Sequence, residues 1–207
     1  MAFTFFFRDR FILEILCQEL MPKFQTQTAV KVWDAGCALG QEPYTFAIIM
    51  AETIGKYEFE KLKIIATDLD PNDTFAPIVN KATYRKFDLS RMPDKILEKY
   101  FLYMGDDNYL LIDWVKNALT FHKQDLTLLK PIENNFDAII CKNVLLHLQY
   151  EERVKVITMF GRSLVANGLL SLEQTQPLPV ECEHFFEKLT PDSSIYRKIN
   201  HPSSVSN

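Results

Sequence analysis

The stretch from Val30 to Tyr44 most constrains what this chain can fold into. It begins with a short β-branched run that ends at Trp33. Asp34 and two glycines, Gly36 and Gly40, come next, and an apolar, helix-forming run follows them. Strand, tight turn and helix in this order form the first half of a βαβ unit. Glycine permits the positive φ and the close backbone approach that such a turn needs beside a ligand. The alternative is an ordinary strand-to-helix turn.

The residues of this turn also indicate the kind of ligand. A helix N-terminus offers N–H groups to an anion. Asp34, expected at the tip of the strand, would repel a pyrophosphate but could hold a cationic amino group. The segment is neither Gly-x-Gly-x-x-Gly nor a P-loop, because no Lys-Ser/Thr pair follows Gly40. A zwitterionic ligand that carries an adenosine, such as S-adenosylmethionine, fits better.

Composition narrows the class of protein. A length of 207 residues favours one domain, and a hydrophobic content of 47% is ordinary for a globular protein. The net charge of −4 argues against a general nucleic-acid binder. No apolar run reaches the length needed to span a membrane. Arg8, Asp9 and Arg10 interrupt the apolar start before the core of a signal peptide could form. The cysteines and histidines lack metal-ligand spacing, which predicts free thiols and no metal site. We therefore expect a cytoplasmic protein without nucleic acid or membrane insertion.

Strand-like and helix-like runs alternate along the rest of the chain. Strands are expected at residues 30–33, 63–67, 119–123, 136–141, 168–172 and 194–198. Helices are expected at residues 45–51, 75–81, 92–100 and 151–164, with a short one near 182–188. This alternation predicts an α/β fold with a doubly wound, mostly parallel sheet and helices on both faces. Ligands bind such sheets at the carboxyl ends of the strands.

Single residues set several expected boundaries. Pro22 is expected to end an N-terminal helix with an apolar face made of Phe11, Ile12, Ile15, Leu16 and Leu20. The pair Asn167-Gly168 is expected to end the helix at 151–164. Residues 82–90 are expected to form a loop. Residues 101–104 and 109–112 flank a turn signal at Gly105 and predict a β-hairpin, which we interpret as a small antiparallel insertion.

Acidic residues close the second predicted strand. Asp68 comes first past that strand, where a doubly wound fold places a ribose-binding carboxylate. Asp70 is either a second candidate or the cap of the next helix, whose start Pro71 would mark. Asp125 and Asn143 also fall at predicted strand ends. We expect these polar side chains to gather at one edge of the sheet.

Five motifs occur in order along the chain. They are Thr4-Phe-Phe-Phe-Arg8-Asp9, Trp33-Asp-Ala-Gly36-Cys-Ala-Leu-Gly40-Gln-Glu42-Pro43-Tyr44, Ala66-Thr-Asp68-Leu-Asp70, the pairs Tyr84-Arg85 and Tyr100-Phe101, and Phe136-Asp-Ala-Ile-Ile-Cys141-Lys-Asn143-Val144. Together they resemble the chemotaxis-receptor methyltransferase (CheR) family, from about Thr4 to Lys198. The resemblance implies a Rossmann-like class I methyltransferase fold. It also implies methyl transfer from S-adenosylmethionine to glutamate side chains of a chemoreceptor-type protein, which yields methyl esters and S-adenosylhomocysteine.

The resemblance further implies a set of cofactor-binding residues and no metal ligand. The set is Thr4, Arg8, Gly36, Glu42, Asp68, Asp125, Leu126, Asn143 and Val144. Gly36 would lie against the methionine part with Glu42 nearby, and Asp68 would take the ribose hydroxyls. Asp125 and Leu126 would flank the adenine, where the family often has Asn-Leu. Glu42 has an alternative interpretation as an acid favoured by the helix dipole in the first turn.

The same resemblance places Thr4 and Arg8 over the reaction centre and Asn143 and Val144 near the sulfur. A glutamate side chain has a pKa of ~4.3 and is already a nucleophile at neutral pH, so the protein must mainly orient it. Arg8 is the catalytic residue that we would nominate, because its planar fork can hold a carboxylate while the free lone pair attacks. The alternative is that Arg8 pairs with Asp9 or with a surface acid.

Departures from the family pattern leave other functions open. Family members usually carry a helical domain before the Thr-x-Phe-Phe-Arg segment, and it helps contact the receptor; this sequence starts at that segment. His147 stands where an aromatic residue is common, although a lone histidine there is also typical of a satisfied, partly buried side chain. The alternatives are a cofactor-binding regulatory or scaffold module without catalysis, and a small-molecule carboxyl methyltransferase.

The expected organisation has three parts. Residues 1–29 form an N-terminal segment and helix that cover the cofactor site. Residues 30–200 form the methyltransferase domain, with the hairpin insertion at about 100–119. Residues 201–207 form a disordered tail. The insertion binds a receptor-tail peptide in some family members, and the sequence leaves open whether it does so here. It also leaves the oligomeric state unknown.

Overall fold

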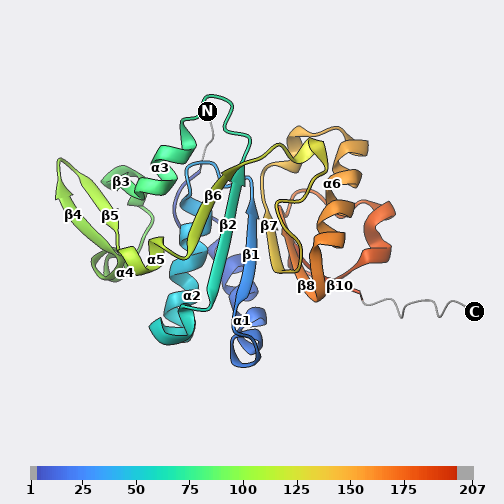
Figure 1. Cartoon of the computed structure of the whole chain (residues 1–207), viewed down its shortest axis with the longest axis horizontal. Helices are drawn as coiled ribbons and strands as arrows, with labels where there is room; N and C mark the ends of the chain where they lie inside the picture. The colour runs from blue at the N-terminus through green and yellow to red at the C-terminus, as the bar shows by residue number, and fades with distance from the viewer. Residues whose placement is uncertain (1–3, 200–207) are drawn as a thin grey trace, which may run out of the picture.

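The computed structural model describes residues 4–199, and within them one mixed sheet organises the chain (Figure 1). Its strand order is β6-β2-β1-β7-β8-β10-β9. The bounds are β1 (Val30–Ala35), β2 (Leu62–Asp68), β6 (Leu119–Lys123), β7 (Phe136–Cys141), β8 (Leu164–Leu172), β9 (Phe186–Lys188) and β10 (Ile195–Lys198). The first five strands of this order pair in parallel, and β10 pairs antiparallel with β8 and β9. The doubly wound, mostly parallel sheet is confirmed.

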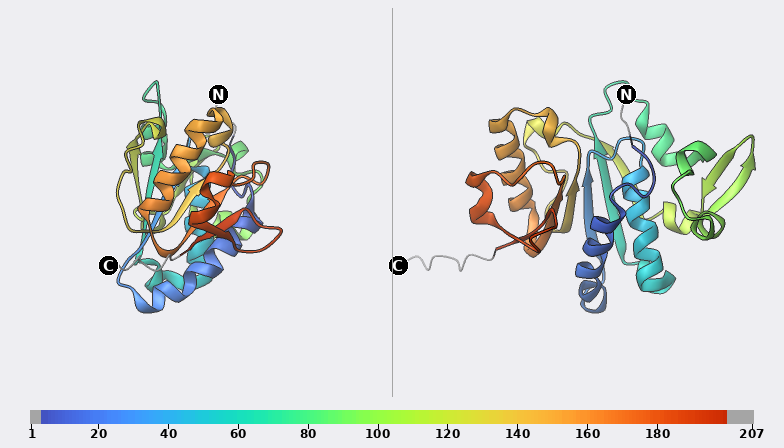
Figure 2. Two further views of the ribbon diagram at one scale, coloured as in Figure 1. Left: turned by 90° about the vertical axis from the view of Figure 1, so that its right-hand side faces the viewer. Right: turned by 180° about the vertical axis from the view of Figure 1, so that it is seen from behind.

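Helices cover both faces of this sheet (Figure 2). Helices α1 (Arg10–Thr26) and α2 (Gln41–Phe59) lie on one face, and α6 (Tyr150–Ser163) lies on the other. Side chains of a strand alternate between faces. Val30 and Val32 of β1 therefore join the core beneath α1 and α2, whereas Trp33 joins the core beneath α6. There the Trp33 ring meets Phe160 edge to face, with centroids 5.1 Å apart.

A small antiparallel sheet stands beside the main one, with the order β3-β5-β4 (Figure 1). Its strands are β3 (Thr83–Arg85), β4 (Phe101–Gly105) and β5 (Asn108–Leu111), and the adjoining helices are α3 (Phe75–Lys81), α4 (Asp94–Tyr100) and α5 (Asp113–Lys116). The hairpin is confirmed. The expectation of a loop over residues 82–90 was wrong, because Thr83–Arg85 pairs with β5 and a short 3₁₀ helix follows it.

Two expected helix boundaries were also wrong. Pro22 lies inside α1, which continues to Thr26, and Leu20 and Phe24 on either side of it are buried. Phe11 is 66% exposed, and the buried stripe of α1 is Ile12, Leu13, Leu16, Cys17, Leu20 and Phe24. Helix α6 ends at Ser163, whereas Asn167, with φ 57°, lies within β8. A left-handed residue serves a strand irregularity as well as a helix end, and the β7–β8 register shifts nearby.

Other expectations agree with the structure in whole or in part, or concern residues that it does not describe. Strands β6 and β7 and helix α3 have the predicted bounds. The short helix expected near 182–188 is correct only in its first part, the 3₁₀ helix Val180–Phe185, because residues 186–188 pair with β10 as strand β9. The four cysteines are free and buried. In the described part of the chain, no helix combines the length and apolarity needed to cross a membrane. The tail at 201–207 lies outside the described residues.

Candidate functional site

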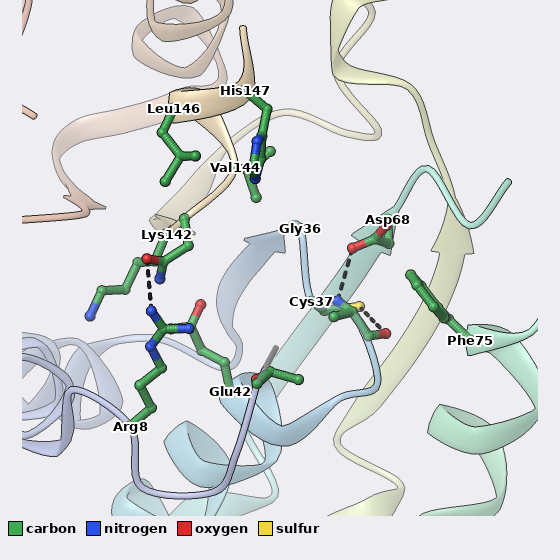
Figure 3. Close-up of a pocket in the computed structure, with 13 residues that line it drawn as sticks. Arg8, Gly36, Cys37, Glu42, Asp68, Phe75, Lys142, Val144, Leu146 and His147 are labelled. Atoms are coloured by element: carbon green, nitrogen blue, oxygen red, sulfur yellow. Dashed lines mark hydrogen bonds between the residues drawn. The ribbon is translucent and has the colours of Figure 1, made fainter. Parts of the chain in front are cut away.

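The loop after β1 is fastened to the end of β2. The backbone N–H groups of Gly36 and Cys37 donate to the carbonyl oxygen of Thr67 at 2.7 and 3.0 Å. The N–H of Ala38 donates to Oδ2 of Asp68 at 2.8 Å, as Figure 3 shows. Because β1, β2 and β7 are parallel neighbours, their carboxyl ends meet at one edge of the sheet. This edge is the topological switch point, where a doubly wound sheet binds its ligand.

Gly36 brings two loops close together at this edge. Its φ is +110°, and an added Cβ would lie 2.1 Å from Cγ2 of Val144 in the segment after β7. A β-branched side chain cannot easily turn away from such a contact, because its χ1 is restricted. Only glycine therefore fits both the conformation and the space.

A cavity of about 510 Å³ opens over this edge (Figure 3). It is lined by Thr4, Arg8, Gly36, Cys37, Ala38, Glu42, Asp68, Phe75, Lys142, Asn143, Val144, Leu146 and His147. A recess of about 230 Å³ shares four of these residues and adds Asp125 and Leu126 to its wall. All nine predicted cofactor-binding residues therefore line the cavity or its recess. Their individual roles stay predictions.

Asp34 does not stand where the sequence suggested. It lies within β1 and not at its tip, is only 1% exposed, and is not among the lining residues. Its two carboxylate oxygens have no hydrogen-bond partner among the described residues. Burial raises its pKa well above the ordinary value, as do the negative charges of Glu42 and Asp68, while Lys142 opposes the shift. The acid that faces the cavity from the start of α2 is Glu42.

Glu42 stands in the first turn of α2 and is half-buried. Burial raises its pKa to about 7, and the negative charges of Asp9 and Glu173 act in the same direction, while the positive charges of Lys142 and Arg8 lower it. The first-turn and cavity-lining interpretations of Glu42 therefore both describe its position. A cation in the cavity would favour its ionised form.

Asp68 and Asp70 have different surroundings. Asp70 accepts hydrogen bonds from the backbone N–H groups of Thr74, Phe75 and Ala76 at 2.8–3.2 Å, so it caps the start of α3. The cap is confirmed, but the helix begins at Phe75 and not at Pro71. Asp68 lines both the cavity and its recess. Its bond from Ala38 uses one lone pair and leaves others for a ligand.

Residues 4–9, which we name the N-terminal strap, pass along the cavity. Phe6 is fully buried and meets Tyr84 of β3 edge to face, with centroids 4.8 Å apart. The N–H of Phe7 donates to Oγ1 of Thr45 at 3.0 Å. Nη2 of Arg8 donates to Oδ1 of Asn143 at 2.9 Å (Figure 3). The strap therefore joins the small sheet, α2 and the segment after β7.

Lys142 is the site residue that sequence reasoning missed. Its side chain is 1% exposed, and Nζ lies 2.8 Å from Oδ2 of Asp9. The ion pair that we considered between Arg8 and Asp9 is therefore replaced by one between Lys142 and Asp9. A lysine directly after the apolar strand β7 was the available signal, since such a position is rarely charged without a partner. His147 is exposed beside the cavity, unlike the partly buried histidine that was the alternative.

The residues present fit S-adenosylmethionine. Glycine at position 36 removes the Cβ that would fill the space between the two loops. Acidic groups for an ammonium and for hydroxyls are available in Glu42 and Asp68, and the recess beside them includes Leu126, which is 8% exposed. A cavity with charged groups of both signs and an apolar recess suits a zwitterion linked to an adenosine.

Comparison with known proteins gives a consistent result. The sequence matches the family model described as "CheR methyltransferase, SAM binding domain" over residues 2–195. A "Chemotaxis protein methyltransferase" of Listeria innocua is 29% identical over 167 residues, which is 80% of this chain and 61% of that protein. A "Probable chemotaxis protein methyltransferase" of Rhizobium etli is 25% identical, over 90% of this chain and 72% of that protein. The chain thus spans about three fifths of the length of the Listeria relative.

Proposed function

The chain belongs to the CheR methyltransferase family, and on this premise we propose that it methylates glutamate carboxylates of a chemoreceptor-type protein in the cytoplasm. The methyl donor in this proposal is S-adenosylmethionine, and the products are a glutamate methyl ester and S-adenosylhomocysteine. The observation that carries the proposal is the cavity, whose wall combines Gly36, Glu42 and Asp68 with the guanidinium of Arg8.

Four residues account for donor binding in this proposal. Glu42, in its ionised form, holds the ammonium of the methionine part, and Asp68 accepts from the ribose hydroxyls. Asp125 and Leu126 flank the adenine in the recess, whose lining they form. The bound donor supplies an electrophilic methyl group.

Arg8 accounts for acceptor binding. A glutamate carboxylate is ionised at neutral pH, and its burial is costly unless a cation pairs with it. Arg8 lines the cavity, and its bond to Asn143 restricts the orientation of its guanidinium. An arginine fork can donate to the two oxygens of a carboxylate, which keep a lone pair free for attack. Orientation of this kind is worth roughly 7–11 kcal/mol of barrier. Lys142, the other cation on the wall, already pairs with Asp9.

Binding and transfer test the proposal separately. Titration calorimetry with S-adenosylhomocysteine should give a saturable heat. No heat at high ligand concentration would rule out the proposed donor-binding site. Labelled methyl should then appear as base-labile ester on receptor peptides that contain glutamate, and not on peptides with glutamine in its place. Turnover on small acids but not on peptides would identify the chain as a small-molecule carboxyl methyltransferase. Binding of S-adenosylhomocysteine without any turnover would favour a cofactor-binding scaffold module.

Arg8→Ala tests the acceptor side. We expect transfer to fall at least about a hundredfold, which is the order of effect of a misplaced reactant, while the affinity for S-adenosylhomocysteine changes little. The matched control is Arg162→Ala, because Arg162 is exposed in the last turn of α6, on the other face of the sheet from α1. If Arg8→Ala kept full activity, the role given to Arg8 would be wrong.

A further inference from the structure

The backbone of the strap around Arg8 is unusual. Phe7 has a φ of 60° and Asp9 has a φ of 52°, so two left-handed residues flank Arg8. Residues with a Cβ avoid this region, because Cβ approaches the following carbonyl oxygen. Such conformations persist where surrounding contacts hold them. The turn that presents Arg8 to the cavity therefore needs fixed partners outside itself.

Asp9 shows which partner holds the turn. It occupies the N-cap position of α1, where an aspartate side chain usually accepts from the first N–H groups of the helix. Here its side chain makes no capping bond. Its Oδ2 instead lies 2.8 Å from Nζ of Lys142. The carboxylate thus faces β7 and not its own helix.

Lys142 in turn depends on this carboxylate. A buried ammonium is costly unless it is paired, and the side chain of Lys142 is 1% exposed against 38% for Asp9. Glu42 and Asp34 also lie near enough for Lys142 to lower the pKa of each. Lys142 therefore lies close to three acids, of which Asp9 is the one within ion-pair distance among the described residues. The contact is an ion pair and not an aligned hydrogen bond, because Nζ has no hydrogen-bond partner among these residues.

The two contacts at the end of β7 act together on the strap. Lys142 pairs with Asp9, and its neighbour Asn143 accepts from Arg8. Two adjacent residues after β7 thus hold two adjacent residues of the strap. We propose that Lys142 is a positioning residue, whose ion pair with Asp9 fixes the left-handed turn of the strap and so directs Arg8 into the cavity. This proposal rests on the proposed function only for what Arg8 does there.

Opening of the strap can be measured at one of its own amide groups. The N–H of Phe7 is hydrogen-bonded to Oγ1 of Thr45, so its hydrogen exchange measures opening of the strap without any substrate. The variants are Lys142→Met and Asp9→Asn, singly and together, in the full chain. We expect exchange at Phe7 to accelerate about tenfold or more in each single variant. Asp9→Asn leaves the buried ammonium of Lys142 without its partner, and Lys142→Met removes the contact that holds Asp9 toward β7. The double variant should exchange no faster than the worse single one.

Two further variants serve as controls. Lys142→Arg keeps the charge and should restore slow exchange at Phe7. Lys116→Met removes a lysine that pairs with the exposed Asp113 near the small sheet, and it should leave exchange at Phe7 unchanged. Should Lys142→Met fail to fold, Asp9→Asn carries the test, because Asp9 is partly exposed and its replacement is nearly isosteric.

Kinetics distinguish positioning from general stability. Asp9→Asn should lower kcat/KM for the acceptor about a hundredfold and leave the affinity for S-adenosylhomocysteine within a few-fold, and Lys142→Arg should recover most of the loss. Lys142→Met should also weaken binding of S-adenosylhomocysteine, because Glu42 loses a neighbouring positive charge.

Exchange at Phe7 and methyl transfer together decide the proposal. Parent-like exchange in both single variants overturns it, whatever the activity. Faster exchange with undiminished transfer also overturns it, since the strap would then open without consequence for Arg8. Faster exchange in a protein whose parent form transfers no methyl group supports the ion pair as the hold on the strap and refutes the proposed function alone.

Discussion

Glu42 is a carboxyl group whose charge responds to conditions near neutral pH. Burial raises its pKa to about 7, and charges of both signs surround it, so a cation in the cavity changes its protonation. Asp34 lies deeper, is not among the lining residues, and has a pKa raised well above the ordinary value, so the carboxyl group on the wall that changes charge near neutral pH is Glu42. The residue expected to hold an ammonium is therefore only partly ionised at neutral pH.

The affinity for S-adenosylhomocysteine should consequently rise with pH. Below a pKa of about 7, Glu42 is protonated and cannot pair with an ammonium; above it, the pair forms. A single group with that pKa predicts an affinity about tenfold higher at pH 8 than at pH 6. Calorimetry across this range measures it. Glu42→Gln should flatten the profile, and Glu151→Gln, at an exposed position, should not. An unchanged profile in Glu42→Gln would assign the ammonium to another group.

A second prediction for a single residue concerns Gly36. In Gly36→Ala, the new Cβ would meet Val144 and the residue would keep a φ of +110°, so we expect both lower stability and at least about a tenfold loss of S-adenosylhomocysteine affinity. Gly105→Ala is the matched control, because its φ is +88° with open space around it. It should cost about 1–2 kcal/mol of unfolding free energy and leave affinity intact. Equal behaviour of the two variants would contradict the role of the close approach.

A site residue could be predicted from the sequence when its role depends on residues close to it along the chain. Gly36, Asp68 and Asn143 follow strands, and strand ends are visible locally. Lys142 also follows a strand, but its meaning depends on Asp9 at the other end of the chain. Sequence order carries no trace of that contact. The burial of Asp34 was missed for a simpler reason: β1 runs two residues further than its β-branched run.

At the level of elements, predictions succeeded where local sequence determines the boundary. Strand β7 lies between the polar residues Asn135 and Lys142, strand β6 ends before Gln124, and both strands have the predicted limits. Strand β3 was missed because its pairing partner, β5, lies further along the chain. Pro22 was given too much weight, since a proline removes one N–H while the buried Leu20 and Phe24 still hold α1 against the core.

The cap of α3 can be tested as an element on its own. Burial of Asp70 acts to raise its pKa, but hydrogen bonds from Phe75, Ala76 and Thr74 outweigh it, so the pKa is lowered. The stabilisation is therefore present above the pKa of the unfolded chain and is lost as pH falls through the folded value. Asp70→Ala should lower the unfolding free energy by about 1 kcal/mol at pH 7, and by less in acid.

Denaturant unfolding at pH 7 and at about pH 3 measures this difference. Asp70→Asn keeps an acceptor oxygen and should fall between parent and alanine variant at pH 7. Asp192→Ala removes an exposed aspartate and should change little. If Asp70→Ala were as stable as the parent at pH 7, the cap would contribute nothing to α3.

For the whole molecule, the main sheet joins two cores, and the cavity lies at its switch edge. The cavity wall includes the strap, the ends of β1 and β2 and the segment after β7, so a ligand there contacts parts far apart in sequence. A ligand that binds only the folded chain stabilises all of it together. At a concentration of 100 Kd this amounts to about 2.7 kcal/mol.

Thermal unfolding should report this linkage. For a chain of this length, S-adenosylhomocysteine at 100 Kd should raise Tm by roughly 5–11 °C in one transition. Adenosine at the same concentration lacks the methionine part and should raise it less. A Tm independent of S-adenosylhomocysteine would mean that the ligand does not bind this fold.

The joining of the strap to the end of β7 has a consequence for synthesis on the ribosome. Arg8 and Asn143 are 135 positions apart. At about 5–20 residues per second, translation needs roughly 7–27 s to pass from one to the other. Once Asp68 has been made, the nascent chain carries the β1 turn and the residues of β2 that fasten it, but it still lacks the residues that hold Arg8 and Asp9. The donor half of the site can thus take shape during translation, whereas the acceptor half awaits the emergence of β7 from the exit tunnel.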